Sequence, residues 1–196
     1  RGAAMKLGQL LSLDAGDLLP PELAAILAQL RAEARPMPAR QLDKALTAAW
    51  GAEWQGKLAR FDRRPFAAAS IGQVHRGVSK SGRDLAIKVQ YPGVARSIDS
   101  DVDNVATLLK ISNLLPRHID LGPILAEAKV QLQQEADYAR EGAMLTRFGK
   151  LLADDDRFSV PRRYAPLSGP NVLAMDYIPV VPIDTLVGLP EATRDH

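Results

Sequence analysis

The residues best suited to chemistry are the loop Ala67–Val74, which reads AAASIGQV, and Lys88, which follows it closely. One ATP-binding pattern, G-x-G-x-x-G-x-V, covers the phosphates with a loop and is followed by a strand lysine in V-A-I-K. On this pattern Gly72 is the third glycine, and Ala67 and Ala69 replace the first two. We therefore expect the loop to cover a nucleotide while approaching its phosphates less closely, because two positions carry a methyl group.

Lys88 could neutralise phosphate oxygens if a carboxylate held it in place. A solvated surface lysine is the simpler alternative, but its register with the loop favours a phosphate-binding role. Asp137 and Glu141 share a face of the predicted long helix, whereas Glu135 is rotated from Glu141 by roughly 120°. Helical geometry alone leaves the partner open among four residues: Glu127, Glu135, Asp137 and Glu141.

Met175 lies on the apolar segment Val172–Ile178, where a protein kinase carries its gatekeeper before the adenine-binding hinge. A methionine packed in the core is the alternative interpretation. The residues predicted to form the nucleotide site are Ala67, Ala68, Ala69, Ser70, Ile71, Gly72, Val74, Ala86, Lys88, Met175, Asp176 and Tyr177.

Lys6-Leu7-Gly8-Gln9 is unusual within the first predicted helix. A glycine inside a helix costs about 1 kcal/mol relative to alanine, so it often marks the close approach of another group. Lys6 and Gln9 could supply hydrogen-bond donors to that neighbour. A frayed, solvated helix end is the alternative interpretation.

Composition excludes several classes of protein. The chain has 196 residues, no cysteine and a formal net charge of +2, which argues against thiolate catalysis, Cys-based zinc sites and nucleic-acid binding. Its three histidines lack metal-ligand spacing, so no metal site is predicted within it. The apolar runs are shorter than the roughly 18 residues that a membrane span needs.

Periodicity predicts an α+β protein, in which a small antiparallel sheet packs against helices. This resembles the N-terminal lobe of a protein kinase with a helical extension over residues 1–60, a lobe with an inserted helix over 61–184, and a following lobe from 185. The expected elements after the first two helices are a helix at Ala39–Trp50, a hairpin with its turn at Ser79–Arg83 and returning strand at Leu85–Tyr91, helices at Val94–Leu115 and Pro123–Leu152, and strands at Phe158–Arg163 and Val172–Ile178.

Four sequence features together resemble the UbiB family of atypical kinase-like proteins, also called aarF-domain-containing kinases. They are Lys6-x-Gly8-Gln9, the loop Ala67–Val74, Ala86-Ile87-Lys88 and Glu135-Ala136-Asp137. The resemblance runs from residue 1 to about residue 184. Asp176 departs from the family pattern, which has glutamate there, and Val180 stands where glycine is expected.

The resemblance implies roles for residues that spacing left undecided. Lys6 and Gln9 would belong to an extension that crosses the nucleotide site and blocks a protein substrate. Glu135 and Asp137 would form an E-x-D element in which Glu135 pairs with Lys6. Glu141 would pair with Lys88.

The resemblance also implies ATP or ADP with Mg²⁺ as cofactor, with the metal ligands and the catalytic loop beyond residue 196. We therefore expect the ATP-binding lobe of a bacterial atypical kinase or ATPase that supports ubiquinone or isoprenoid-lipid metabolism, inert as an isolated piece. It would be cytoplasmic and peripheral at the inner membrane face, with a prenyl lipid or membrane as a further partner. A pseudokinase that acts as a regulatory or lipid-binding scaffold is the alternative.

Overall fold

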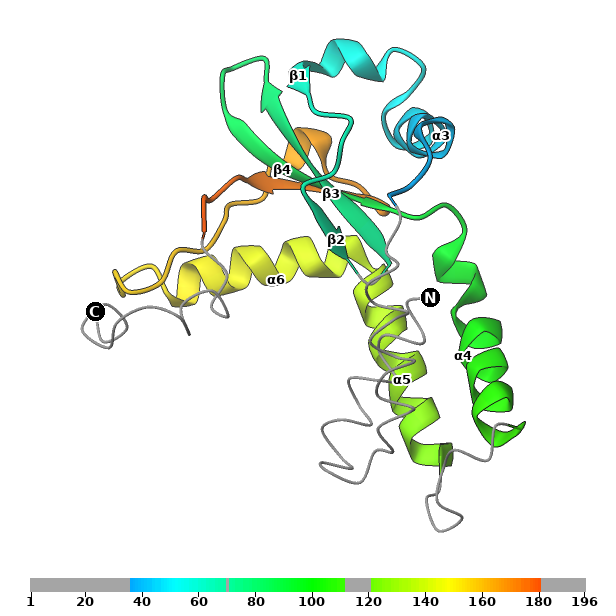
Figure 1. Ribbon diagram of the computed structural model, residues 1–196. Coiled ribbons are helices and arrows are strands. Elements are labelled where there is room, and N and C mark those ends of the chain that lie inside the picture. The colour runs from blue at the N-terminus through cyan, green and yellow to red at the C-terminus, as the bar shows by residue number, and fades with distance from the viewer. Residues whose placement is uncertain (1–35, 70, 112–120, 181–196) are drawn as a thin grey trace, which may run out of the picture.

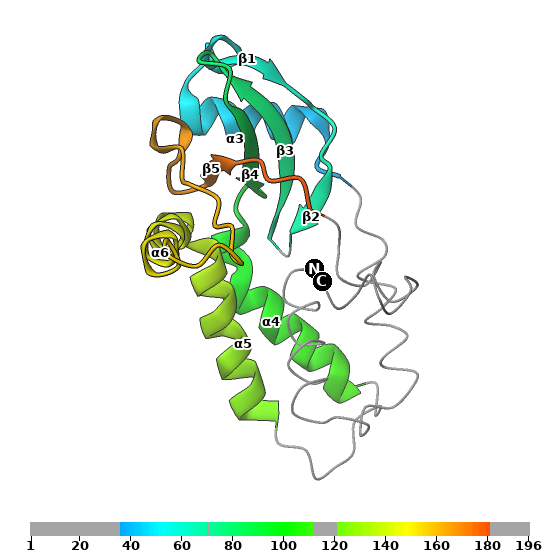
Figure 2. The same cartoon turned by 90° about the vertical axis from the view of Figure 1, so that its left-hand side faces the viewer.

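The computed structural model describes residues 36–69, 71–111 and 121–180, and these form a small antiparallel sheet with helices on both faces (Figures 1 and 2). The predicted α+β class is confirmed. The first two predicted helices, including Lys6, Gly8 and Gln9, lie outside the described residues, as does Ser70. In chain order the elements are α3 (Ala39–Trp50), η2 (Trp54–Lys57), β1 (Leu58–Phe61), β2 (Ala67–Ala69), β3 (Gly72–Ser79), β4 (Asp84–Gln90), α4 (Val94–Ile111), α5 (Leu121–Ala136), α6 (Tyr138–Leu151), η3 (Ala165–Leu167) and β5 (Val172–Asp176).

The strands are arranged in the order β1-β3-β4-β5, with β2 also paired to β3. Strands β3 and β4 form the predicted hairpin, whose turn contains Gly82 at a φ of 82°. Only glycine adopts this left-handed conformation without strain, which is why the turn forms there. Strands β1 and β2 were not predicted, because four and three residues are too few for a readable alternation.

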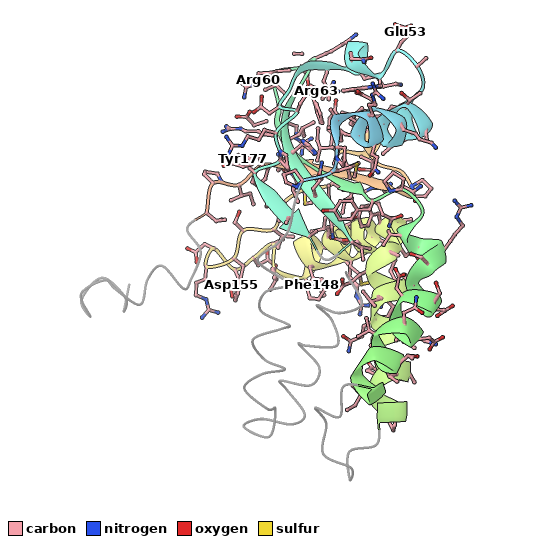
Figure 3. All side chains as sticks on the ribbon, turned by 45° about the vertical axis from the view of Figure 1, so that its right-hand side comes forward. Glu53, Arg60, Arg63, Phe148, Asp155 and Tyr177 are labelled. Atoms are coloured by element: carbon pink, nitrogen blue, oxygen red, sulfur yellow. The ribbon has the colours of Figure 1, made fainter. Side chains whose placement is uncertain are left out.

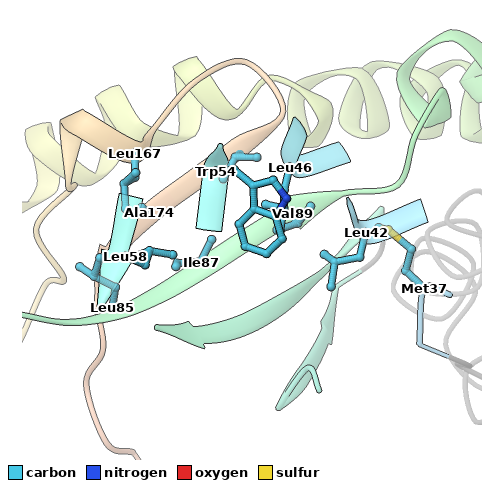
Figure 4. Packing of buried hydrophobic residues seen from close by; sticks show 11 residues of the cluster. Met37, Leu42, Leu46, Trp54, Leu58, Leu85, Ile87, Val89, Leu167 and Ala174 are labelled. Atoms are coloured by element: carbon cyan, nitrogen blue, oxygen red, sulfur yellow. The ribbon is translucent and has the colours of Figure 1, made fainter. Parts of the chain in front are cut away.

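One face of the sheet packs against α3. The side chains of Leu85, Ile87 and Val89 alternate along β4 and are fully buried on this face, beneath Trp54 and Leu46 (Figure 4). Strand geometry sends every second residue to the opposite face, so burial of these three aliphatic side chains directs Ala86 and Lys88 the other way. The hydrophobic core therefore fixes the direction of Lys88.

The opposite face is covered by helices that follow the hairpin. Helices α4 and α5 lie side by side and extend away from the sheet (Figures 1 and 2). A second hydrophobic core joins them to the sheet and consists of Ile71, Ile98, Val102, Ala128, Leu132, Tyr138 and Leu173.

The prediction of one continuous helix over Pro123–Leu152 was wrong. The helix breaks at Asp137, and α6 leaves α5 at a sharp angle (Figure 1). Two side chains stabilise the break: Gln90 donates to the carbonyl of Ala136 at 2.9 Å, and Asp137 accepts from the backbone N–H of Arg140 at 2.9 Å. Asp137 is thus an N-cap, which satisfies a donor that the new helix would leave unpaired.

The predicted strand Phe158–Arg163 is also absent from the described residues. It reduces to an isolated bridge between Arg163 and Met175. Pro161 lies inside the predicted strand, and proline cannot donate the backbone hydrogen bond that a ladder requires.

A buried polar chain lies behind the nucleotide loop. Gln73 accepts from the backbone N–H of Met37 at 2.6 Å, and its amide N–H donates to Nε2 of His75 at 2.8 Å. Nδ1 of His75 then donates to the carbonyl of Asp62 at 2.9 Å. Both ring nitrogens are engaged in a way that requires neutral histidine, and Phe61 stacks on the ring at 5.0 Å.

We expect the hydrogen bonds of His75 to make the folding stability of the protein depend on pH. Burial lowers the pKa of His75, with Arg63 adding to the effect. The unfolded state therefore binds the proton more readily, so stability is fully present above about pH 6.5 and falls as the pH drops towards the folded-state pKa. Thermal melts at pH 7.5 and 5.5 should show a larger loss for the wild type than for His75→Gln. Equal losses would show that His75 is not responsible.

Candidate functional site

Lys88 and Glu141 form the centre of the candidate site. The ammonium nitrogen of Lys88 lies 2.8 Å from Oε1 and 2.7 Å from Oε2 of Glu141. The two side chains are 17% and 34% exposed, so the pair is only partly screened by water. Of the four carboxylates that helical geometry left open, the structure thus brings Lys88 together with Glu141, the partner that the resemblance implied.

Helix α6 positions Glu141 for this contact. Glu141 lies in the first turn of the helix, four residues after the N-cap Asp137, where a negative charge is favourable. Gly142 allows the helix to approach the sheet, because a Cβ there would lie 3.2 Å from Leu173 and 2.9 Å from Arg163. The break in the long helix is therefore what aims Glu141 at the strand that carries Lys88.

The predicted nucleotide loop lies beside Lys88. It begins as β2, in which Ala67 and Ala69 pair with Val74 and Gly72, and Val74 pairs in turn with Lys88. Residues paired directly across antiparallel strands project to the same face. The two methyl groups that replace glycines therefore lie on the Lys88 face of the sheet.

Gly72 is required by close packing. A Cβ at this position would lie 2.4 Å from the carbonyl oxygen of Val89 and 2.8 Å from the hydroxyl of Tyr138. Ala68 pairs with Gln73, which places it on the opposite face, and the side chain of Ile71 is 1% exposed in the second core. The predicted role of these two residues in binding a nucleotide is therefore confined to their backbone.

Strand β5 carries the predicted hinge. Met175 pairs with Ala86 on the Lys88 face and packs against the second core. Asp176 is engaged elsewhere: its carboxylate accepts from Arg83 at 2.5 Å and from the Arg162 side chain at 3.2 Å. The hydrogen bond from Arg83 holds the pKa of Asp176 below its usual range. The carboxylate of Asp176 is therefore held by two arginines, and the predicted place of this residue in the nucleotide-site hinge stays a prediction that concerns its backbone.

Tyr177 follows β5 and packs against the segment that precedes β2 (labelled in Figure 3). Its ring meets the edge of Phe66, just before β2, at 5.6 Å, and the guanidinium of Arg76 lies 4.3 Å from its centroid. Its backbone N–H donates to the carbonyl of Asp84 at 3.1 Å. The residue predicted for the hinge thus packs directly against the start of the predicted nucleotide loop.

Comparison with known families is consistent with this geometry. Residues 29–196 match the model of the ABC1 atypical kinase-like domain. The chain belongs to this family. The predicted resemblance to the UbiB family and the kinase-like fold are confirmed.

Curated relatives cover the whole chain or most of it. The chain is 41% identical over 196 residues to atypical kinase coq-8, mitochondrial, of Caenorhabditis elegans. The matched region covers 100% of this chain and 26% of that protein. It is 44% identical over 196 residues to atypical kinase COQ8B, mitochondrial, of Rattus norvegicus (100% and 37%), and 44% identical over 175 residues to atypical kinase COQ8, mitochondrial, of Saccharomyces cerevisiae (89% and 35%). The chain thus spans roughly a quarter to two fifths of these relatives. All three are eukaryotic and give no support to the predicted bacterial source.

A solved structure shows the same fold. It is described as the complex of Rv3197 and erythromycin from Mycobacterium tuberculosis, with a TM-score of 0.62 and 30% sequence identity. The match covers 92% of this chain and 46% of that chain.

In this ABC1 domain a cleft of about 640 Å³ opens beside the Lys88–Glu141 pair. Three of its lining residues are glutamates, which makes the cleft acidic despite Lys88 and Arg140. No group of three or more His, Cys, Asp or Glu residues that could hold a metal occurs among the described residues. The lining residues are Lys88, Glu127, Gln131, Gln134, Glu135, Arg140, Glu141 and Met144.

The two acidic residues of the E-x-D element in this ABC1 domain lie in different surroundings. Glu135 lines the cleft, whereas Asp137 caps α6. The regulatory roles predicted for both stay predictions, as do those of Lys6, Gly8 and Gln9 outside the described residues. Sequence reasoning missed Tyr138, which lies beneath Lys88, although the adjacency of an aromatic residue to a helix cap was visible in the sequence.

Proposed function

We propose that this chain forms the nucleotide-binding part of an atypical kinase or ATPase. The Lys88–Glu141 pair carries the proposal, because both carboxylate oxygens of Glu141 hold the ammonium on the face that the nucleotide loop also reaches. A lysine held in this way can neutralise phosphate oxygens. The roles are then plain: Lys88 positions the phosphates, Glu141 orients Lys88, and Ala67–Gly72 covers the nucleotide.

The described residues fit a nucleotide better than a metal ion. Close packing holds Gly72 of β3 against β4 and Tyr138, and Lys88 supplies a positive charge in the lining of the cleft. The surrounding glutamates disfavour a bare phosphate and favour a nucleotide that arrives with a cation. We propose ATP or ADP with Mg²⁺, whose charge would offset that of the phosphates, with the metal ligands outside the described residues.

The wider role follows from the relatives. We propose that the whole protein supports ubiquinone or other isoprenoid-lipid metabolism and works peripherally at a membrane, because the relatives are mitochondrial atypical kinases. Within the described residues, the helices are too short or too polar to cross a bilayer. On α6 the side chains of Phe148 and Leu151 are 52% and 66% exposed, which supports contact with a prenyl lipid or a membrane surface.

Exchange of Glu141 for glutamine tests the proposal. Glu141→Gln removes the charge that anchors Lys88, so the full-length protein should bind ATP with Mg²⁺ about fivefold more weakly, the effect of one partly screened charge-assisted contact. Isothermal titration calorimetry measures the affinity. Glu127→Gln is the matched control, because Glu127 lines the same cleft but accepts from Gln131 at 2.7 Å.

Comparison of the two variants distinguishes the specific effect of the Lys88–Glu141 ion pair from the effect of the overall charge of the cleft. If both weaken ATP equally, the effect comes from the charge of the cleft, and Glu141 has no special role. If neither changes the affinity, the ion pair does not serve nucleotide binding.

A further inference from the structure

Tyr138 lies at the junction of the three parts of the candidate site. It is the first residue of α6, directly after the N-cap Asp137 and three residues before Glu141. Its side chain is 1% exposed. The face of its ring lies 4.7 Å from the ammonium nitrogen of Lys88, measured to the ring centroid.

The ring and Glu141 give Lys88 two kinds of support. The carboxylate attracts the ammonium by charge and hydrogen bonds, and the ring attracts it through the negative face of its π-system. This second attraction is strengthened where water is partly excluded, as it is around the 17%-exposed Lys88 side chain. The ring faces the ammonium itself, so it acts on the group that would meet the phosphates.

The hydroxyl of Tyr138 plays no part in the contact with Lys88. It is buried and has no hydrogen-bond partner among the described residues. It lies 2.8 Å from the position that a Cβ of Gly72 would occupy. Burial raises the pKa of Tyr138, and Glu141 raises it further, so the phenol stays neutral and cannot act as an anionic partner for Lys88. The contact with Lys88 therefore depends on the aromatic face.

We propose that Tyr138 is a positioning residue that holds the ammonium of Lys88 in its phosphate-binding position through the face of its ring. The proposal rests on the proposed nucleotide function of Lys88. It predicts that phenylalanine at this position preserves ATP affinity and that an aliphatic residue of similar burial lowers it. The hydroxyl is dispensable, and its removal should stabilise the nucleotide-free protein because a buried unpaired donor is costly.

The test compares Tyr138→Phe with Tyr138→Leu in the full-length protein. For ATP with Mg²⁺, we expect Tyr138→Phe to bind within about twofold of wild type with a raised melting temperature, and Tyr138→Leu to bind about fivefold more weakly while still folded. If Tyr138→Leu binds ATP as the wild type does, or if Tyr138→Phe loses as much affinity as Tyr138→Leu, the proposal is overturned.

A second readout does not depend on nucleotide binding. Loss of the ring removes one of the two groups that hold and cover the Lys88 ammonium, so its acetylation by acetic anhydride at pH 8, followed by mass spectrometry, should be about fivefold faster in Tyr138→Leu and unchanged in Tyr138→Phe. Lys129, which is 29% exposed and paired with Asp103 at 2.8 Å, is the internal control. Faster acetylation of both lysines would reveal loosening of the fold and overturn the proposal, as would no change at Lys88. A selective change at Lys88 without any ATP binding would instead support the contact and contradict the proposed function.

Discussion

Lys88→Ala in the full-length protein should reduce ATP affinity by about a hundredfold and abolish ATP hydrolysis. The size follows from the loss of a charge-assisted contact to two phosphate groups, since each such contact contributes about 1.5–3 kcal/mol and 1.4 kcal/mol corresponds to tenfold. The substitution also leaves Glu141 without its partner in an already acidic cleft, which adds repulsion towards the phosphates. Calorimetry with ATP and Mg²⁺, together with a phosphate-release assay, measures both effects.

Lys80→Ala is the control for this result. Lys80 is exposed in the β3–β4 turn of the same hairpin, so it carries the same charge at the far end of the strands. We expect its ATP affinity to stay within about twofold of wild type. Should Lys88→Ala bind and hydrolyse ATP normally, Lys88 would not be a phosphate ligand, and a regulatory or lipid-binding scaffold would become the better account of the protein.

Gly72→Ala should destabilise the protein by about 3 kcal/mol and weaken ATP binding as well. The added Cβ would lie 2.4 Å from the carbonyl oxygen of Val89, a backbone atom that cannot move without separating β3 from β4. Overpacking of this kind usually costs about 1–3 kcal/mol, and a rigid backbone neighbour places this case at the upper end. Because Val74 and Lys88 are paired two residues further along the same strands, displacement there also disturbs the site.

Urea denaturation measures the first effect and calorimetry the second. Gly56→Ala is the matched control, because nothing lies within 4 Å of the Cβ it would add. Its free energy of unfolding should change by less than about 0.5 kcal/mol. A Gly72→Ala variant as stable as Gly56→Ala would show that the loop and β4 are not packed as closely as the structure indicates.

The elements that sequence predicted well are those whose signals are local. The β3–β4 hairpin was recognisable from a glycine-containing turn between apolar runs, and only one strand boundary residue differed at each end of β4. Helix α3 followed from the prolines before it and the glycine after Trp50. Each of these signals lies within a few residues, so no distant contact was needed to interpret it.

The wrong prediction of one continuous helix over Pro123–Leu152 arose because the break depends on a distant contact. The break between α5 and α6 is stabilised by Gln90, which lies 46 residues before the carbonyl it contacts. The alanine-rich sequence around Ala136 favours a continuous helix. The periodicity of a segment carries no information about a side chain that contacts it from a distant strand. The contact between Asp176 and Arg83 was not visible from spacing for the same reason, because the two residues lie 93 positions apart.

The amino-acid sequence by itself determined the loop, the lysine in register with it and the family. Helical spacing left the carboxylate partner of Lys88 open, and only the family resemblance implied Glu141. The tertiary structure shows why Glu141 meets Lys88, because the contact depends on where α6 begins and on how closely Gly142 lets it approach the sheet. It also showed Tyr138 beneath the ammonium, a contact between residues 50 positions apart that no spacing reveals. Sequence specifies residue types and local conformation, whereas the geometry of a charged pair arises only when separate elements share a core.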